Sequence, residues 1–335
     1  MKKLVLLLIV ALLALTSCNQ NGGTTETEGE TATGGAYKVG SYSVTPDAGI
    51  TEGDEEDRAQ INTTIATVVL DADGKIVDVN IDTAQNSVTI KDGAVTVPTD
   101  TPTKKEKQDA YNMKGASPIG KEWFEQIEAL ENHLVGKNLD EVKGIELDEN
   151  TVVTDEDLLA SVTIKVAGYL EAVTKAMENA VDVEGAVAKV GTTSFTQIED
   201  QASDEGGRVT FNTHYGHVAL DADGKILNAF IDTAQNRVAY NADGEFEAHT
   251  GTDSKKVLKE EYNMKGASPI GKEWYEQAAA LEEYVVGLTV DEVNAIETDD
   301  AGYLTQEDLV SSVTVNISNY QQIIERAAAA AVEVK

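Results

Sequence analysis

Two threonines in matching sequence contexts are the candidates for covalent chemistry. Thr163 ends the run Asp-Leu-Leu-Ala-Ser-Val-Thr that begins at Asp157, and Thr314 ends the run Asp-Leu-Val-Ser-Ser-Val-Thr that begins at Asp308. Ser311 adds a second hydroxyl within the later run. A threonine hydroxyl at the surface can be esterified by another enzyme, as phosphorylation shows. Both threonine hydroxyls are therefore candidates for covalent modification.

Each candidate threonine is expected at the start of a helix. Apolar residues recur at helical spacing over 162–180 and 313–331, which predicts a closing helix in each place. A helix N-terminus presents free N–H groups and a partial positive charge, and both suit a phosphodiester. The spacing fits equally well two threonines that only begin a helix, so that interpretation stays open.

A nearly identical stretch of sixteen residues occurs twice and shows that the chain contains two repeats. The run Tyr111–Gln126 returns as Tyr262–Gln277 with a single Phe-to-Tyr change, whereas the flanking sequences differ far more. A segment that stays the same in both repeats while the flanking residues change is constrained, either by packing or by a ligand. Ser117 and Ser268 lie within this run after Gly-Ala and are rival attachment sites, although no acid stands six positions before either of them.

The repeats divide the chain into two expected domains, residues 36–180 and 185–335, each of normal domain size. Each repeat opens with strands that alternate apolar and polar residues and closes with helices, which predicts an α+β fold with a mostly antiparallel sheet. The expected hairpins are 61–70 with 75–81 around the turn 71–74, and 209–220 with 225–231 around the turn 221–224.

The segments after each hairpin are harder to assign from the pattern. The runs 82–86 and 232–236, both Asp-Thr-Ala-Gln-Asn, are expected just past the second strand, with short strands following at 87–90 and 237–240. Residues 91–110 are expected to form a polar loop. Pro118 and Pro269 each follow a serine that can cap, so each is expected at the first position of a helix.

The sequence does not favour a metal site. The turns 71–74 and 221–224 read Asp-Ala-Asp-Gly but lack the remaining EF-hand ligands, so they are better interpreted as hairpin turns. His214 and His217 could suggest a metal on a strand, but repeat one has Thr64 and Thr67 there, so both histidines are expected at the surface. No nucleophile–base pair and no phosphate-binding glycine loop occurs, so no catalytic residue is predicted.

The first residues are expected to be a targeting segment. Lys2 and Lys3 precede the apolar run 4–15, which is short for a membrane span, and the sequence Leu-Thr-Ser-Cys ending at Cys18 resembles the lipobox of bacterial lipoproteins. Residues 1–17 are then a signal peptide, Cys18 is lipidated, and 18–35 form a polar tether. An ordinary secretory signal with a chance cysteine is the alternative. The formal charge of −33 argues against nucleic acid as a partner.

The threonine runs resemble the flavinylation motif of FMN-binding domains, Asp-x-x-Ser/Thr-Gly-Ala-Thr/Ser. In that family FMN is joined through its phosphate to the final Thr by an ApbE-type FAD:protein FMN transferase. The sequence departs from the motif, because Ser161 and Ser312 replace its Gly, and Val162 and Val313 replace its Ala. In repeat one Ala160 also replaces its Ser/Thr.

With the lipobox and the duplication, the chain is similar to the flavinylated lipoproteins of Firmicutes. The resemblance implies two covalent FMN groups per chain and attachment to the extracellular side of the cell membrane. Electrons would come from membrane quinone and NADH dehydrogenase components and pass to extracellular acceptors, so the chain is an electron carrier and not an enzyme by itself. In this family fragments of the signal peptide also serve as pheromones.

The repeated run is then interpreted as a lid over the flavin, with Met and Trp against the ring and Lys114 or Lys121 favouring an anionic reduced flavin. The cofactor-binding residues expected besides the threonine runs are Met113, Lys114, Ser117, Trp123, Met264, Lys265, Ser268 and Trp274. The alternative is a structural helix cap that packs Trp123 and Trp274 into the core. At the level of function, the alternative is a surface lipoprotein that binds another ligand or is purely structural.

Overall fold

The computed structural model describes residues 36–45, 49–53 and 55–334, which belong to the compact unit Thr33–Lys335. The predicted α+β class is confirmed, since two antiparallel sheets are combined with helices. The signal peptide, Cys18 and the tether lie outside the described residues. Within the described residues, no helix is long and apolar enough to cross a membrane.

The first repeat contains a sheet and a group of helices. Its elements are β1 (Lys38–Val44), β2 (Gly49–Thr51), β3 (Asp57–Leu70), β4 (Ile76–Lys91), β5 (Ala94–Thr96), α1 (Lys104–Lys107), the 3-10 helix η1 (Gln108–Tyr111), α2 (Trp123–Leu134), α3 (Leu139–Lys143), α4 (Glu156–Leu159), α5 (Ala167–Glu178) and β6 (Val181–Asp182). The strand order is β5-β4-β3-β1-β6, with β2 also paired to β3, and every pair is antiparallel.

The second repeat follows the same order of elements, without a counterpart of β2. Its elements are β7 (Lys189–Ser203), β8 (Gly206–Leu220), β9 (Ile226–Asn241), β10 (Phe246–Thr250), α6 (Lys255–Leu258), the 3-10 helix η2 (Lys259–Tyr262), α7 (Trp274–Val285), α8 (Val290–Asn294), α9 (Glu307–Val310), α10 (Ser318–Ala329) and β11 (Val332–Glu333). The strand order is β10-β9-β8-β7-β11.

The predicted hairpin turns are confirmed. Asp71 accepts backbone hydrogen bonds from Asp73 and Lys75 at 2.9 and 2.8 Å, and Gly74 closes the turn with a φ of +75°. Asp221 does the same in repeat two. The carboxylates of these aspartates thus accept the backbone N–H groups of their own turn, as in an Asx turn.

The expected break after the second strand was wrong. Strand β4 runs without interruption through Asp82–Asn86, and β9 runs through Asp232–Asn236. Polar residues are tolerated there because partners meet them: Asp82 accepts the N–H of Lys105 at 3.1 Å, and Asp232 accepts the hydroxyl of Ser254 at 2.6 Å. The expected loop 91–110 in fact contains β5, α1 and most of η1.

Two expected helix starts were also wrong. Helices α2 and α7 begin at Trp123 and Trp274, several residues after Pro118 and Pro269. In both helices the N-cap is a glutamate, Glu122 or Glu273, which forms a capping box with the glutamate three residues later. The prolines lie instead in turns that precede the cap. In each repeat this turn contains a glycine at positive φ, which is Gly120 or Gly271.

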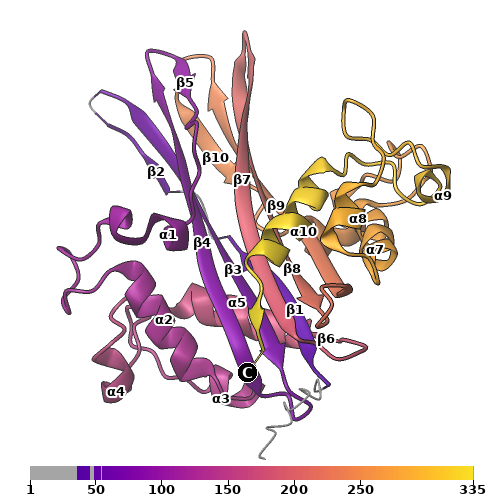
Figure 1. Ribbon diagram of the computed structural model, residues 1–335. Helices are drawn as coiled ribbons and strands as arrows, with labels where there is room; N and C mark the ends of the chain where they lie inside the picture. The colour runs from indigo at the N-terminus through magenta and orange to yellow at the C-terminus, as the bar shows by residue number, and fades with distance from the viewer. Residues whose placement is uncertain (1–35, 46–48, 54, 335) are drawn as a thin grey trace, which may run out of the picture. The chain divides into compact units, whose positions relative to one another are not determined.

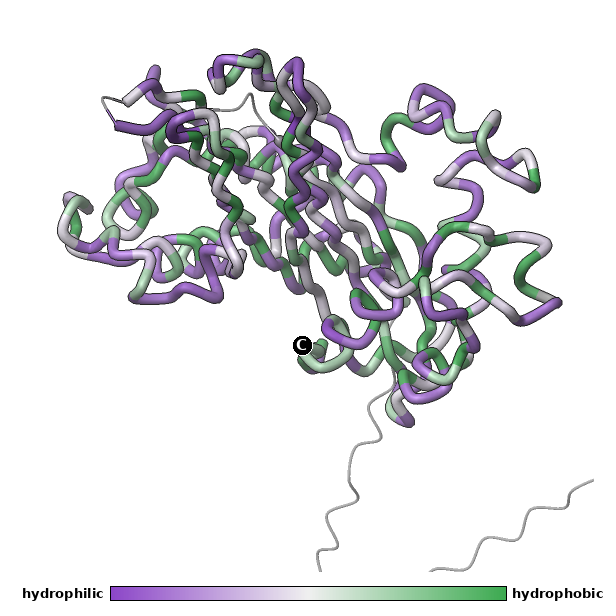
Figure 2. Tube along the Cα trace, turned by 90° about the horizontal axis from the view of Figure 1, so that it is seen from above, coloured by the Kyte–Doolittle hydropathy of each residue, from purple (hydrophilic) through white to green (hydrophobic). Residues whose placement is uncertain are grey.

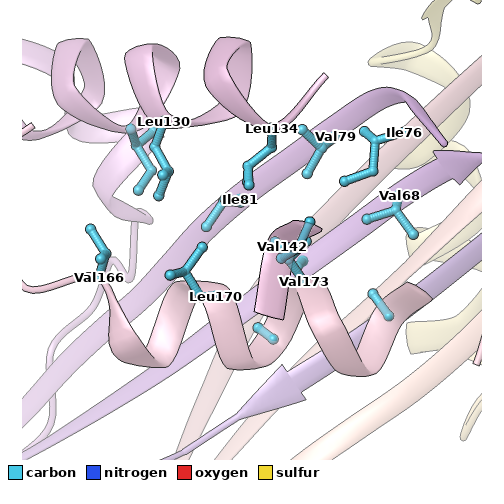
Figure 3. Packing of buried hydrophobic residues seen from close by; sticks show 14 of the residues in the cluster. Val68, Ile76, Val79, Ile81, Leu130, Leu134, Val142, Val166, Leu170 and Val173 are labelled. Atoms are coloured by element: carbon cyan, nitrogen blue, oxygen red, sulfur yellow. The ribbon is translucent and has the colours of Figure 1, made fainter. Parts of the chain in front are cut away.

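Helices cover the outer face of each sheet. Figure 1 shows the helices of the first repeat on one side of the strands and those of the second repeat on the other side. In repeat one, the buried apolar residues of α2 and α5 meet those of β3 and β4; Figure 3 shows Leu130, Leu170 and Ile81 pointing into this shared space. Figure 2 shows hydrophilic loops around the outside. Each repeat therefore has its own helix-facing core.

The opposite faces of the two sheets pack on each other. Alternate residues of β3 and β4 meet alternate residues of β8 and β9 in a cluster formed by Ala59, Ile61, Val88, Ile90, Val209, Phe211, Val238 and Tyr240. A second cluster joins Ile65 and Ala84 to the fully buried Tyr215. The division into domains 36–180 and 185–335 remains a prediction, and both share this buried layer.

Gly191 sets how closely α10 approaches β7. A Cβ at this position would overlap the carbonyl oxygen of Ala327, and Gly40 has the same relation to Ala176 of α5. We expect Gly191→Ala to lower the free energy of unfolding by about 1–3 kcal/mol, because the helix must move away from the sheet. The control Gly168→Ala, inside α5 with open space around the added methyl group, should be neutral or stabilising in urea unfolding. Equal stability of the two variants would show that α10 is not held this closely.

Candidate functional site

A glutamine joins the two rival attachment residues in each repeat. In repeat one, Thr163 donates to Oε1 of Gln126 from its backbone N–H at 2.8 Å and from its hydroxyl at 3.2 Å. The amide nitrogen of Gln126 donates to the hydroxyl of Ser117 at 3.1 Å. The threonine and the serine are therefore the two ends of one hydrogen-bonded chain.

Repeat two reproduces this chain with the same distances. Thr314 donates to Oε1 of Gln277 at 2.8 Å from N–H and at 3.2 Å from the hydroxyl, and Gln277 donates to Ser268 at 3.1 Å. Both glutamines are fully buried. The sequence did not lead us to predict these glutamines as site residues. A signal was present, however, because each glutamine is the last residue of the repeated run.

The threonines do not lie at helix N-termini, which corrects the expectation for both. Helix α5 begins at Ala167 and α10 at Ser318, so Thr163 and Thr314 lie in the loops before them. The reason lies in partners outside the segment: the backbone N–H of Thr163 is held by Gln126, and that of Val166 is held by the carbonyl of Thr151. The helix-terminus charge therefore does not support phosphate binding at these positions; the glutamine positions the hydroxyl instead.

An aromatic pair and a lysine lie next to this chain in both repeats. Trp123 donates its indole N–H to Tyr169 at 2.9 Å, and Trp274 donates to Tyr320 at 2.8 Å. The ammonium of Lys104 lies 5.3 Å from the Trp123 ring centroid, and that of Lys255 lies 5.3 Å from the Trp274 centroid. The cation–π geometry is thus preserved between the repeats.

Burial lowers the pKa of Lys104 to about 8, and the nearby Asp82 carboxylate opposes this shift. Between about pH 8 and 10 the unfolded chain binds more protons at this lysine than the folded protein does, so the stability should rise with pH. We expect the free energy of unfolding of the wild type, minus that of Lys104→Met, to increase by about 1–3 kcal/mol over this range. A difference that stays flat in urea titrations at pH 7–10 would contradict the shift.

Repeat two contains a cleft of about 430 Å³ beside Thr314. Its lining residues come from the helix-facing side of the sheet, α6, the repeated run, the loop before α10 and the start of α10. They include Met264, Ser268, Trp274 and Thr314 among the predicted residues, and His214, Lys255, Tyr262 and Tyr320 among the others. This volume is within the range of small-molecule sites. The structure thus brings together four predicted residues on one concave surface.

Other predicted residues lie elsewhere or act through their backbone. Met113 and Lys114 donate their N–H groups to Glu122 at 2.8 and 3.0 Å, so the glutamate orders the repeated run. The side chains of Lys114 and Lys265 are exposed, and Lys265 does not line the cleft. Trp123 and Trp274 are each 2% exposed, as the packing interpretation of the run expects, and Trp274 lines the cleft as well.

Two of the remaining predicted residues of the threonine runs, Asp157 and Ser311, are exposed. Asp157 is an exposed residue in the first turn of α4, and Leu158 next to it is buried. Ser311 is exposed at the end of α9. The side chain of Asp308 lies outside the described part of the chain. Asp157 therefore does not act on the threonine from within the buried site.

The expectation that His214 and His217 lie at the surface was wrong. They are 5% and 1% exposed, because β8 is a central strand with helices on one face and the other sheet on the opposite face. Nδ1 of His217 lies 2.7 Å from the hydroxyl of Ser41 in repeat one, and its ring stacks on Phe230. His214 faces the cleft side and is paired through Nδ1 with Thr233 at 2.9 Å.

Comparisons with known proteins leave the family open. No family model matches the chain, and no curated protein matches it. Among solved structures, an Ntf2-like protein involved in plasmid conjugation is 11% identical over 64% of this chain and 78% of its own, with a TM-score of 0.11. An exported protein with a YmcC-like fold from Bacteroides fragilis is 9% identical over 66% and 96%, with a TM-score of 0.12. Neither likeness carries an argument about fold or function.

Proposed function

We propose that this chain is a lipid-anchored extracellular flavoprotein with one FMN esterified to Thr163 and another to Thr314. The observation that supports this most is the Thr–Gln–Ser chain, which has the same partners and nearly the same distances in both repeats. Packing alone requires a buried glutamine to be hydrogen-bonded, but it does not require the bond to end on a threonine hydroxyl at a cleft.

The residues around Thr314 fit a flavin. The cleft offers aromatic side chains for a planar ring, namely Tyr262, Trp274 and Tyr320, and a cation at Lys255. His214 in its wall has a buried Nε2 without a hydrogen-bond partner among the described residues. A ring system with polar edges can pack against the half-buried Tyr262 and offer an acceptor to that nitrogen. In repeat one the counterpart residues are Lys104, Tyr111, Trp123 and Tyr169.

The glutamine has a defined role in the attachment. In the transferase reaction the oxygen of the threonine hydroxyl bonds to the FMN phosphorus of FAD, the bond to AMP breaks, and the hydroxyl proton is released. Oε1 of Gln277 accepts both the N–H and the hydroxyl of Thr314, so it fixes the side chain before the reaction. After esterification the N–H bond remains and still holds the loop.

When bound, the flavin supplies the redox chemistry, while the protein supplies position and electrostatics. Under this proposal a lipid on Cys18 keeps the carrier at the membrane, where quinone and NADH dehydrogenase components deliver electrons for extracellular acceptors. The strongly acidic composition suits solubility outside the cell and excludes an anionic surface as a partner through charge alone. A signal-peptide pheromone is compatible with this arrangement but independent of it.

The alternative function is a surface lipoprotein that binds another ligand without a covalent bond or is purely structural. The burial of Trp123 and Trp274 favours it, because packing alone explains the two tryptophans. To separate the two, the chain is produced together with the transferase, unfolded in guanidinium and dialysed. A flavin spectrum that stays with the unfolded chain supports the proposal; a colourless chain supports the alternative.

A further inference from the structure

His214 has no histidine counterpart in repeat one, although most other residues around the two sites match. Its ring lies in β8 on the helix-facing side, 5.1 Å from the Phe195 ring and 6.5 Å from the Tyr320 ring. The corresponding position in repeat one is Thr64, whose hydroxyl lies 3.2 Å from that of Thr83. Thr83 in turn corresponds to Thr233, so both repeats keep the threonine partner and only repeat two adds an imidazole.

The amide side chains near His214 are already paired with one another. Gln235 donates to Asn212 at 2.8 Å, and Gln197 exchanges two hydrogen bonds of 3.0 Å with Asn319. Among the described residues that line the cleft, His214 has the one buried side-chain nitrogen or oxygen without a partner. Leaving such a group unsatisfied is unfavourable, so a ligand in the cleft is the natural partner.

The ring is a neutral donor at this nitrogen. Burial, together with the charge of Lys255, lowers the pKa of His214 to about 3, so the imidazole is uncharged at neutral pH. The hydroxyl of Thr233 has no other acceptor among the described residues, so we assign it as donor to Nδ1. The ring proton is then on Nε2.

We propose that Nε2–H of His214 donates a hydrogen bond to the flavin held in repeat two, and that this makes the two flavins unequal in midpoint potential. The inference rests on the proposed function. Reduction by electrons from the membrane donor adds negative charge to the flavin ring, and a hydrogen-bond donor stabilises the charged form more than the oxidised form. The flavin of repeat two should therefore have the higher potential and receive electrons from that of repeat one.

The test uses the full chain with Thr163→Ala, which leaves only the flavin of repeat two. Into this background His214→Thr and His214→Phe are introduced; both lack the nitrogen, and the phenyl ring keeps the aromatic volume. We expect both to lower the midpoint potential by an amount equal to about a tenfold change in the ratio of reduced to oxidised flavin, about 30 mV for a two-electron couple. Spectroelectrochemical titration measures it.

A second readout does not depend on redox activity. Without the transferase, His214→Phe removes the unpartnered Nε2 but also leaves the buried hydroxyl of Thr233 without its acceptor, so the melting temperature of the apoprotein should stay close to that of the parent. With flavin attached, the same variant should gain less thermal stabilisation than the parent does. An unchanged potential in both variants, or a change in His214→Thr alone, overturns the inference and assigns His214 to packing. Absence of flavin from every chain overturns the proposed function itself.

Discussion

Thr163→Ala and Thr314→Ala should each remove one FMN adduct, and the double variant should carry none. The hydroxyl oxygen is the atom that would bond to phosphorus, so its loss is complete and not graded. Each hydroxyl is held by a buried glutamine in the same geometry, which is why the two sites are expected to respond alike. The measurement is the mass of the intact chain after production with the transferase.

Ser117→Ala and Ser268→Ala are the matched controls for this prediction. Each serine accepts a hydrogen bond from the same glutamine that holds the threonine, so these variants disturb the same chain without removing the threonine hydroxyl. They should retain both adducts. If the serine variants lose flavin and the threonine variants keep it, the attachment belongs to the serines.

Phe211→Ala should be among the most destabilising single substitutions in the protein. Phe211 is fully buried between the two sheets, where residues of both repeats meet. Removing a buried phenyl ring and leaving a cavity lowers the free energy of unfolding by about 3–5 kcal/mol. Chemical denaturation of the full chain measures this loss.

Phe246→Ala serves as the comparison, because Phe246 packs against the same cluster but is only partly buried. Its effect should be clearly smaller. If Phe211→Ala changed the unfolding free energy no more than Phe246→Ala, the layer between the sheets would be loosely packed. The two repeats would then behave as domains that depend little on each other.

The hairpins and the fold class could be predicted because their causes are local. Alternating residues and an Asp-x-Asp-Gly turn specify β3 with β4, and β8 with β9. The continuation of β4 through Asp82 could not be predicted in this way. Its carboxylate is satisfied by the backbone of Lys105 at the start of α1, a partner that only the folded chain brings near.

The burial of the two histidines depends on partners that are remote in sequence. His217 is bonded to Ser41 in the other repeat and to Asn228 on β9, so pattern alone made it look like a polar surface residue. The position of Thr163 before α5 has a similar cause, since Gln126 holds its N–H from another helix. In contrast, Gln126 and Gln277 could have been selected from the sequence, since both end the repeated run.

Covalent flavin on both threonines can be read from the mass of the mature protein, isolated from the cells that produce it. We expect the mass of the lipidated chain plus two FMN groups less two waters, with the added mass on the peptides that contain Thr163 and Thr314. A lipidated chain without any flavin mass, taken from cells in which the transferase is active, would contradict it.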